Sequence, residues 1–223
     1  MVAHLIDLFL HLDAYLNVVI QQYGVWTYLI LFVVVFLETG VVVTPFLPGD
    51  SLLFAAGAFA ARGDLAVGWL FGLLFVAAVL GDTVNYRIGY GLGPRAFHGQ
   101  KRFFKREHLE RTHQFYERYG GKAIVIARFI PIIRTFAPFV AGIGRMSYGR
   151  FVVYNVGGGL LWTALFVFGG YFFGNLSIVQ QNFTLVTLAI ILLSVTPPVI
   201  ELIQHSRRKA HPPGAASHSE KVA

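Results

Sequence analysis

Four charged side chains stand inside otherwise apolar stretches of this chain. Glu38 and Asp50 lie in one such stretch, and Arg128 and Arg134 lie in another. At the centre of a bilayer a charged side chain costs about 2.5–3.5 kcal/mol on insertion scales, so it persists only when it is paired or hydrated. Two acids and two arginines therefore predict that the two stretches meet inside the membrane and neutralise one another.

These four residue types also suit a defined chemistry. The planar fork of an arginine binds phosphate or carboxylate in a bidentate way, so we predict that Arg128 and Arg134 bind a substrate phosphate. A carboxyl group withdrawn from water can exchange protons near neutral pH, so we predict proton coupling by Glu38 and Asp50. The alternative is a buried ion-pair lock with no other role. Against the lock, both pairs lie beside expected backbone breaks, where free amides and carbonyls can receive a ligand.

A second polar cluster is predicted from Asp82 and Tyr86 in one apolar segment and Asn155 in a later one. Asn155 is expected to form hydrogen bonds across helices. An ion pair between Asp82 and Arg87 at the membrane interface is the alternative for that acid. Trp162 fits an aromatic packing residue better than a polar contact.

Enzyme chemistry finds little support in the sequence. All eight histidines lie outside the apolar segments, Asp50 ends an LPGD sequence rather than a GxGD motif, and the chain has no cysteine. His4, Asp7 and His11 recur at helical spacing, which favours a solvated polar face over a metal site. We therefore predict no catalytic residue, no metal and no cofactor.

The segments that carry these residues are long enough to cross a membrane. Of the 223 residues, 56% are hydrophobic and only 13% are charged. About 20 apolar residues span the hydrocarbon core as a helix, which predicts spans over about 66–90, 150–174 and 183–203. Lipid is therefore the expected solvent for most of the chain.

Two further apolar segments, about 24–61 and 122–143, contain prolines that interrupt a helix: Pro45 and Pro48 in the first, Pro131 and Pro138 in the second. In the first segment, each arm of about 15 residues reaches roughly 22 Å, which is short of a full crossing. Both segments are therefore predicted to be re-entrant helical hairpins. Irregular backbone at that depth must be buried in protein or line a wet cavity.

The basic residues set the expected orientation. No Lys or Arg precedes Arg62, whereas residues 95–122 contain eight Lys or Arg and three acids, and Arg207, Arg208 and Lys209 follow in the tail. The positive-inside rule places 95–122 and the C-terminus in the cytoplasm. The net charge of +7 is thus explained without a nucleic-acid partner.

Together these expectations give an all-α integral membrane protein built from inverted repeats, each a re-entrant helical hairpin plus a transmembrane helix. Residues 1–23 are expected to form an amphipathic interfacial helix that precedes a membrane domain over 24–203. An amphipathic cytoplasmic helix is expected at 95–120, and a disordered cytoplasmic tail at 204–223.

The motifs resemble those of the DedA family, also called VTT-domain or SNARE-associated membrane proteins. The resemblance covers about residues 24–175 and rests on four motifs: Glu38-Thr39-Gly40, Pro48-Gly49-Asp50, Gly81-Asp82 with Tyr86 and Gly89, and Ala127-Arg128-Phe129-Ile130-Pro131 with Arg134-Thr135 and Ala141-Gly142. In this chain Tyr90 follows Gly89 where members often have an arginine, a role that Arg87 would have to take.

The resemblance implies a multi-pass protein of the bacterial cytoplasmic (inner) membrane that moves lipids across it. It also implies dependence on the proton gradient, with Glu38, Asp50, Arg128 and Arg134 important. The leading hypothesis is a flippase for an anionic lipid phosphate such as undecaprenyl phosphate, with membrane lipids and protons as partners. A proton-coupled transporter of a small soluble ion or drug and a non-transporting scaffold stay open, as does a homo-oligomer.

Overall fold

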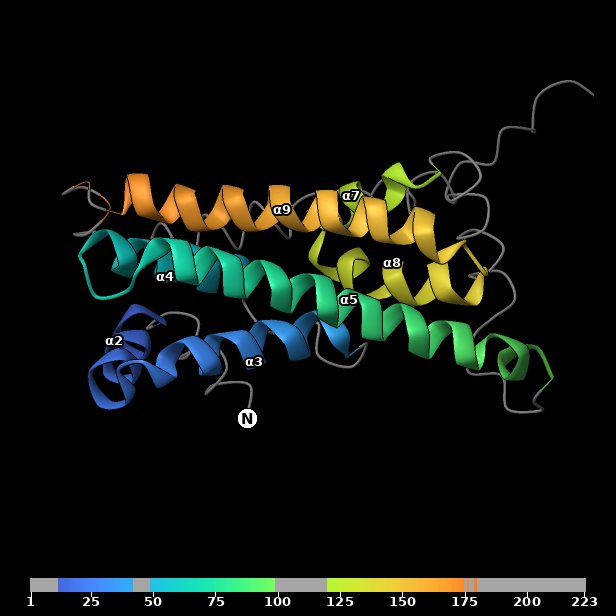
Figure 1. Cartoon of the computed structure of the whole chain (residues 1–223), viewed down its shortest axis with the longest axis horizontal. Helices are drawn as coiled ribbons and strands as arrows, with labels where there is room; N and C mark the ends of the chain where they lie inside the picture. The colour runs from blue at the N-terminus through green and yellow to red at the C-terminus, as the bar shows by residue number, and fades with distance from the viewer. Residues whose placement is uncertain (1–11, 42–48, 99–119, 175, 177–178, 180–223) are drawn as a thin grey trace, which may run out of the picture.

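The computed structural model describes residues 12–41, 49–98, 120–174, 176 and 179, and all regular structure within them is helical (Figure 1). The helices, in chain order, are α2 (Leu12–Tyr23), α3 (Trp26–Gly40), α4 (Gly49–Ala61), α5 (Val67–His98), α7 (Lys122–Ala127), α8 (Pro131–Ile143) and α9 (Tyr148–Phe173). The all-α prediction is confirmed for these residues.

Two of these helices are long and apolar enough to cross a membrane. They are α5, over Val67–Leu92, and α9, over Tyr148–Phe173. Their expected positions, 66–90 and 150–174, agree with the structure to within a few residues, although α5 continues to His98. The apolar helices α3, α4 and α8 have only 13 to 15 residues each, or roughly 20 Å of helix.

The expected break in residues 122–143 is present, but it has a single cause. Pro131 stands at the start of α8, where a missing backbone donor costs nothing. Residues 128–130 separate α7 from α8. Pro138 does not break the chain as expected, because it lies inside α8. The irregular backbone is therefore confined to the three residues that begin with Arg128.

The described helices form two units with crossed packing. In each unit the first short helix packs on its own long helix, α3 on α5 and α7 on α9. The second short helix packs mainly on the long helix of the other unit, so that α4 lies on α9 and α8 lies on α5. In Figure 1, α3 and α4 lie towards one end, α7 and α8 towards the other, and α5 and α9 run along both.

Glycines allow the crossed pairs to approach closely. A Cβ on Gly57 of α4 would overlap the Val167 carbonyl of α9, and one on Gly170 of α9 would overlap the Phe54 carbonyl of α4. The pair formed by α5 and α8 repeats this arrangement, because Gly89 meets the Phe139 carbonyl and Gly142 meets the Tyr86 carbonyl. In all four cases the glycine lies three residues after the carbonyl that its partner glycine meets. Small residues at such crossings are how membrane helices bring their backbones together.

Replacing Gly170 with Ala is expected to destabilise the protein by about 1–3 kcal/mol, because the added methyl group forces α4 and α9 apart. Gly157 is the matched control, since it lies in the same helix and a Cβ there meets nothing within 4 Å. Gly157→Ala is expected to be neutral or stabilising by up to about 1 kcal/mol. Thermal unfolding of both variants in detergent checks this, and equal effects would contradict the close approach.

Helix α2 forms the later part of the expected N-terminal helix. Helix α2 ends at Tyr23, near the expected end of the N-terminal helix, and its Leu16 and Ile20 are buried against the rest of the protein. Several expected features lie outside the described residues: the first 11 residues, the break at Pro45 and Pro48, most of the cytoplasmic helix at 95–120, the span at 183–203 and the tail at 204–223. Whether α2 lies at the membrane interface stays a prediction.

Candidate functional site

The first charged cluster, the Arg134 node, consists of Glu38, Asp50 and Arg134, which are all buried. Glu38 comes from the last turn of α3, Asp50 from the first turn of α4, and Arg134 from the first turn of α8. The Arg134 Nη1 donates to Asp50 Oδ1 at 2.7 Å, and its Nη2 donates to Glu38 Oε1. Both terminal nitrogens of this guanidinium are therefore occupied by carboxylates.

The start of α4 is built to receive the Glu38 side chain. The backbone N–H of Gly49 donates to Glu38 Oε1 at 3.2 Å, which satisfies one of the amides that a helix N-terminus leaves free. A Cβ on Gly49 would overlap the Glu38 carboxylate. The helix N-terminus also favours the negative charge of Asp50 in its first turn. Glycine at this position thus lets both acids share one arginine.

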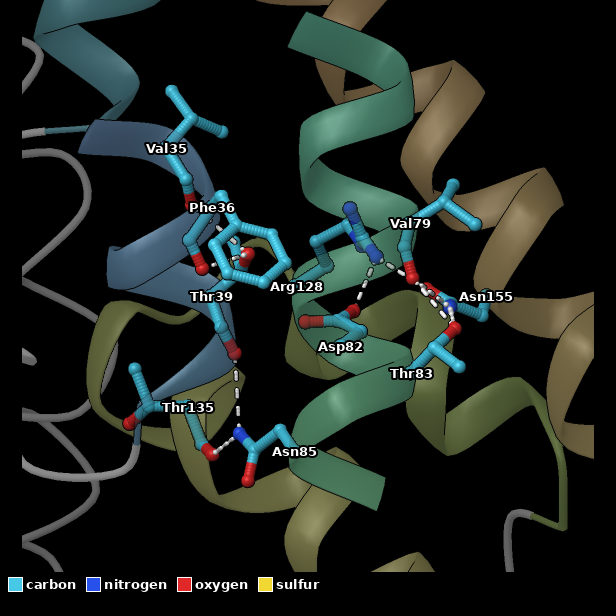
Figure 2. Close-up of polar contacts among 10 residues, drawn as sticks. All are labelled: Val35, Phe36, Thr39, Val79, Asp82, Thr83, Asn85, Arg128, Thr135 and Asn155. Atoms are coloured by element: carbon cyan, nitrogen blue, oxygen red, sulfur yellow. Dashed lines mark hydrogen bonds and ion pairs between the residues drawn. The ribbon is translucent and has the colours of Figure 1, made fainter. Parts of the chain in front are cut away.

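The second cluster, the Arg128 node, consists of Asp82, Arg128 and Asn155 (Figure 2). Arg128 lies at the end of α7, and its Nη2 donates to Asp82 Oδ2 of α5 and, at 2.6 Å, to Asn155 Oδ1 of α9. The Asn155 amide donates in turn to the Val79 carbonyl at 3.0 Å and to Thr83 Oγ1 at 3.3 Å. This node therefore ties α7 to both long helices.

Asn85 fixes the broken helices against each other. Its amide donates to the Thr39 carbonyl of α3 at 3.1 Å and to the Thr135 carbonyl of α8 at 2.7 Å (Figure 2). Thr39 is one of the last residues of α3, where carbonyls lack intrahelical donors. Because Thr39 and Thr135 each follow a residue of the Arg134 node, Asn85 holds the backbone on which that node is built.

Trp162 of α9 lies between the two nodes. Its indole N–H donates to Asp50 Oδ1 at 2.8 Å. The Cζ atoms of Arg134 and Arg128 lie 5.0 Å and 5.9 Å from the ring centroid, within the range of cation–π attraction. Trp162 is completely buried, so this contact set is shielded from solvent.

The structure brings together most of the residues that the sequence singled out, with different partners. Arg134 lies with Glu38 and Asp50, as expected for two stretches that neutralise each other. Arg128 does not join those acids, because the crossed packing puts it against Asp82 instead. Their roles in phosphate binding and proton coupling stay predictions.

Two of the sequence interpretations need correction. The alternative ion pair between Asp82 and Arg87 does not form, because Arg87 lies over the Tyr148 ring at 4.7 Å. Tyr86 is not part of the Arg128 node, since its hydroxyl donates to the Met146 carbonyl and its ring stacks on Phe151 at 4.4 Å.

Sequence reasoning missed Asn85 and took Trp162 for a packing residue. A signal existed for each. Asn85 lies three residues after Asp82, and Trp162 lies seven residues after Asn155, so each shares a helix face with a polar residue already singled out. A polar side chain on such a face is a candidate partner for it.

The charge of the site limits what it can bind. The buried charged side chains of the described residues are three acids and two arginines, so the site carries one net negative charge when all are ionised. Several buried polar atoms have no hydrogen-bond partner within the part of the chain that the structure describes: Glu38 Oε2, Ser51 Oγ, Asp82 Oδ1, Asn85 Oδ1, Arg128 Nε and Nη1, Arg134 Nε and Thr163 Oγ1. Buried polar groups are usually hydrogen-bonded, so these atoms are candidates to contact a bound polar group.

This chain matches one family model and is similar to several known proteins. The VTT domain model matches residues 47–172. A protein named DedA from Escherichia coli (strain K12) is 54% identical over 209 residues, which cover 92% of this chain and 95% of that protein. An uncharacterized membrane protein of Mycobacterium leprae (strain TN) is 40% identical over 169 residues, covering 75% of this chain and 76% of that protein.

The name of a further relative includes a cellular location. Inner membrane protein YqjA of Escherichia coli (strain K12) is 37% identical over 149 residues, which cover 66% of this chain and 68% of that protein. No solved structure matches the chain significantly.

Proposed function

Since this chain belongs to the DedA family of VTT-domain membrane proteins, we propose that it is a flippase, which moves an anionic lipid phosphate across the membrane together with protons. It acts as a transporter and not as an enzyme. Undecaprenyl phosphate is the type of substrate that the proposal names. The location that it assumes is the cytoplasmic membrane of a bacterium, as the name of the YqjA relative says of that protein.

The observation that carries the proposal is the Arg134 fork, whose two terminal nitrogens hold one oxygen each of Glu38 and Asp50. A phosphate presents two oxygens to an arginine in the same way. This fork is buried and lies where α3 ends and where α4 and α8 begin. The first turns of α4 and α8 therefore place backbone amides near it. A phosphate that took the place of the carboxylates would find two donors already oriented.

Proton coupling follows from the charge of the site. With three acids and two arginines, a bound phosphate monoanion would raise the net charge from −1 to −2 in a place withdrawn from water, which is costly. Protonation of Glu38 or Asp50 removes that carboxylate from Arg134 and offsets the charge of the phosphate. The proton and the phosphate therefore enter the site as a pair in this mechanism.

The crossed packing supports an inverted-repeat transporter. The order α3, α4, α5 is repeated by α7, α8, α9, and the reciprocal glycine contacts recur with the same spacing. Short helices that end near the middle of the protein are the usual place of a transport site in such folds. With residues 95–122 and the C-terminus in the cytoplasm, the two broken segments enter from opposite faces as re-entrant hairpins.

Transport assays in liposomes test the proposal. Purified protein is reconstituted with radiolabelled polyprenyl phosphate, and lipid movement between leaflets is followed with and without a pH gradient. We expect transport that the gradient accelerates and that Arg134→Gln abolishes. No lipid movement under either condition would overturn the flippase and favour a soluble ion or drug as the substrate. Full cellular function of Arg134→Gln would favour a scaffold.

A further inference from the structure

Trp162 is a packing residue by position, but it makes a contact that packing does not need. It belongs to the hydrophobic core and meets Phe166 edge to face, with ring centroids 6.0 Å apart. A phenylalanine could also make this edge-to-face contact. The indole N–H, however, is directed at a carboxylate of the Arg134 node, and this is a charge-assisted bond of the stronger kind.

Arg134 and Trp162 share one acceptor atom. Asp50 Oδ1 accepts from Arg134 Nη1 at 2.7 Å and from Trp162 Nε1 at 2.8 Å. The indole therefore holds the same oxygen that occupies the arginine fork. Because both donors share this one oxygen, a ligand that draws Asp50 Oδ1 away from Arg134 must also disturb its bond to the indole.

We propose that Trp162 is a positioning residue that holds Asp50 in the fork of Arg134 and so sets how readily a phosphate replaces this carboxylate. The inference rests on the proposed function. Trp162 stabilises the resting state, in which the carboxylate occupies Arg134. Without the indole donor, the substrate competes against a more weakly held group.

If Trp162 holds Asp50 against the substrate, Trp162→Phe is expected to bind the lipid phosphate more tightly than the wild type. The variant keeps an aromatic ring at this position, although a smaller one, and loses the donor. A hydrogen bond to a charged group contributes about 1.5–3 kcal/mol, so KM for the lipid phosphate is expected to fall by about tenfold or more. The maximal rate is expected to fall as well, because a more tightly bound phosphate leaves more slowly. A purely structural role would instead leave KM unchanged or raise it, with a lower melting temperature.

Trp69→Phe is the matched control, because Trp69 is 73% exposed and lies away from both nodes. Its KM and maximal rate are expected to equal those of the wild type. Transport rates as a function of lipid phosphate concentration in liposomes, together with melting temperatures, give all the values that the comparison needs.

A second measurement leaves Trp162 in place. The chain contains three tryptophans, so Trp26→Phe with Trp69→Phe leaves Trp162 as the only indole. Because its ring faces two guanidinium groups and a carboxylate, displacement of Asp50 is expected to change its emission. A short-chain polyprenyl phosphate in detergent should produce a saturable change, and the corresponding polyprenol should not. Equal responses to both lipids would overturn the inference.

The outcomes separate this inference from the proposed function. If the wild type neither moves nor binds lipid phosphate, the flippase proposal fails whatever Trp162 does. If the wild type transports and folded Trp162→Phe has an unchanged or higher KM, the role of Trp162 fails alone. If Trp162→Phe does not fold, the emission of Trp162 in the double variant decides.

Discussion

Arg134→Lys is expected to reduce lipid phosphate transport by about 10- to 100-fold while the protein stays folded, because lysine keeps the charge but lacks the fork. Arg134 donates from two nitrogens to two different acids. A single ammonium group cannot keep both bonds in this geometry, and each bond to a charged group contributes about 1.5–3 kcal/mol. Transport in liposomes at saturating and limiting lipid concentrations measures the loss.

Arg145→Lys is the control for this substitution, since Arg145 is exposed and belongs to neither node. It is expected to transport like the wild type. Full transport by Arg134→Lys, with the normal dependence on lipid concentration, would show that no bidentate contact to the substrate is made there.

Breaking the Arg128 node is expected to cost about 3–5 kcal/mol of stability, because Arg128→Met leaves Asp82 as an uncompensated buried charge. Removing both charges with Arg128→Met and Asp82→Leu is expected to restore most of that loss, since a buried ion pair contributes little net stability over apolar residues of similar volume. Unfolding in detergent gives both free energies.

Transport by the double variant then separates the two interpretations of Arg128. We expect the folded double variant to have lost lipid phosphate transport, because Arg128 has two nitrogens without partners, Nε and Nη1, that are available to a ligand. A double variant that is both stable and fully active would identify the pair as a lock, and the phosphate role of Arg128 would be wrong.

The sequence placed the helices well because apolar length and proline are local signals. The spans at 66–90 and 150–174 follow from long, mostly hydrophobic runs that contain no proline, and the break before α8 follows from Pro131. The same local reasoning identified Glu38, Asp50 and Arg134 as residues that must find partners in lipid. Each of these predictions concerns a property of a single segment and not a contact between segments.

Partner choice could not be derived in this way. Asp82 and Arg128 are 46 positions apart, and their pairing depends on the crossed packing, which apolar periodicity does not encode. Pro138 was expected to break the helix, but it lies inside α8. A membrane helix tolerates an internal proline when its surroundings satisfy the freed carbonyl, and those surroundings are not visible in the local sequence. Trp162 was misjudged because an indole is both apolar and a donor, and only the position of Asp50 decides which property matters.

The crossed packing also bears on how such a protein could arise. Each long helix has its main short-helix partner in the other unit, so a polypeptide with only one unit would expose the faces of both. Two copies of such a half-length chain, inserted in opposite directions, would cover those faces for each other. A half-length ancestor with this packing would therefore have needed a second copy of itself to bury its helix faces.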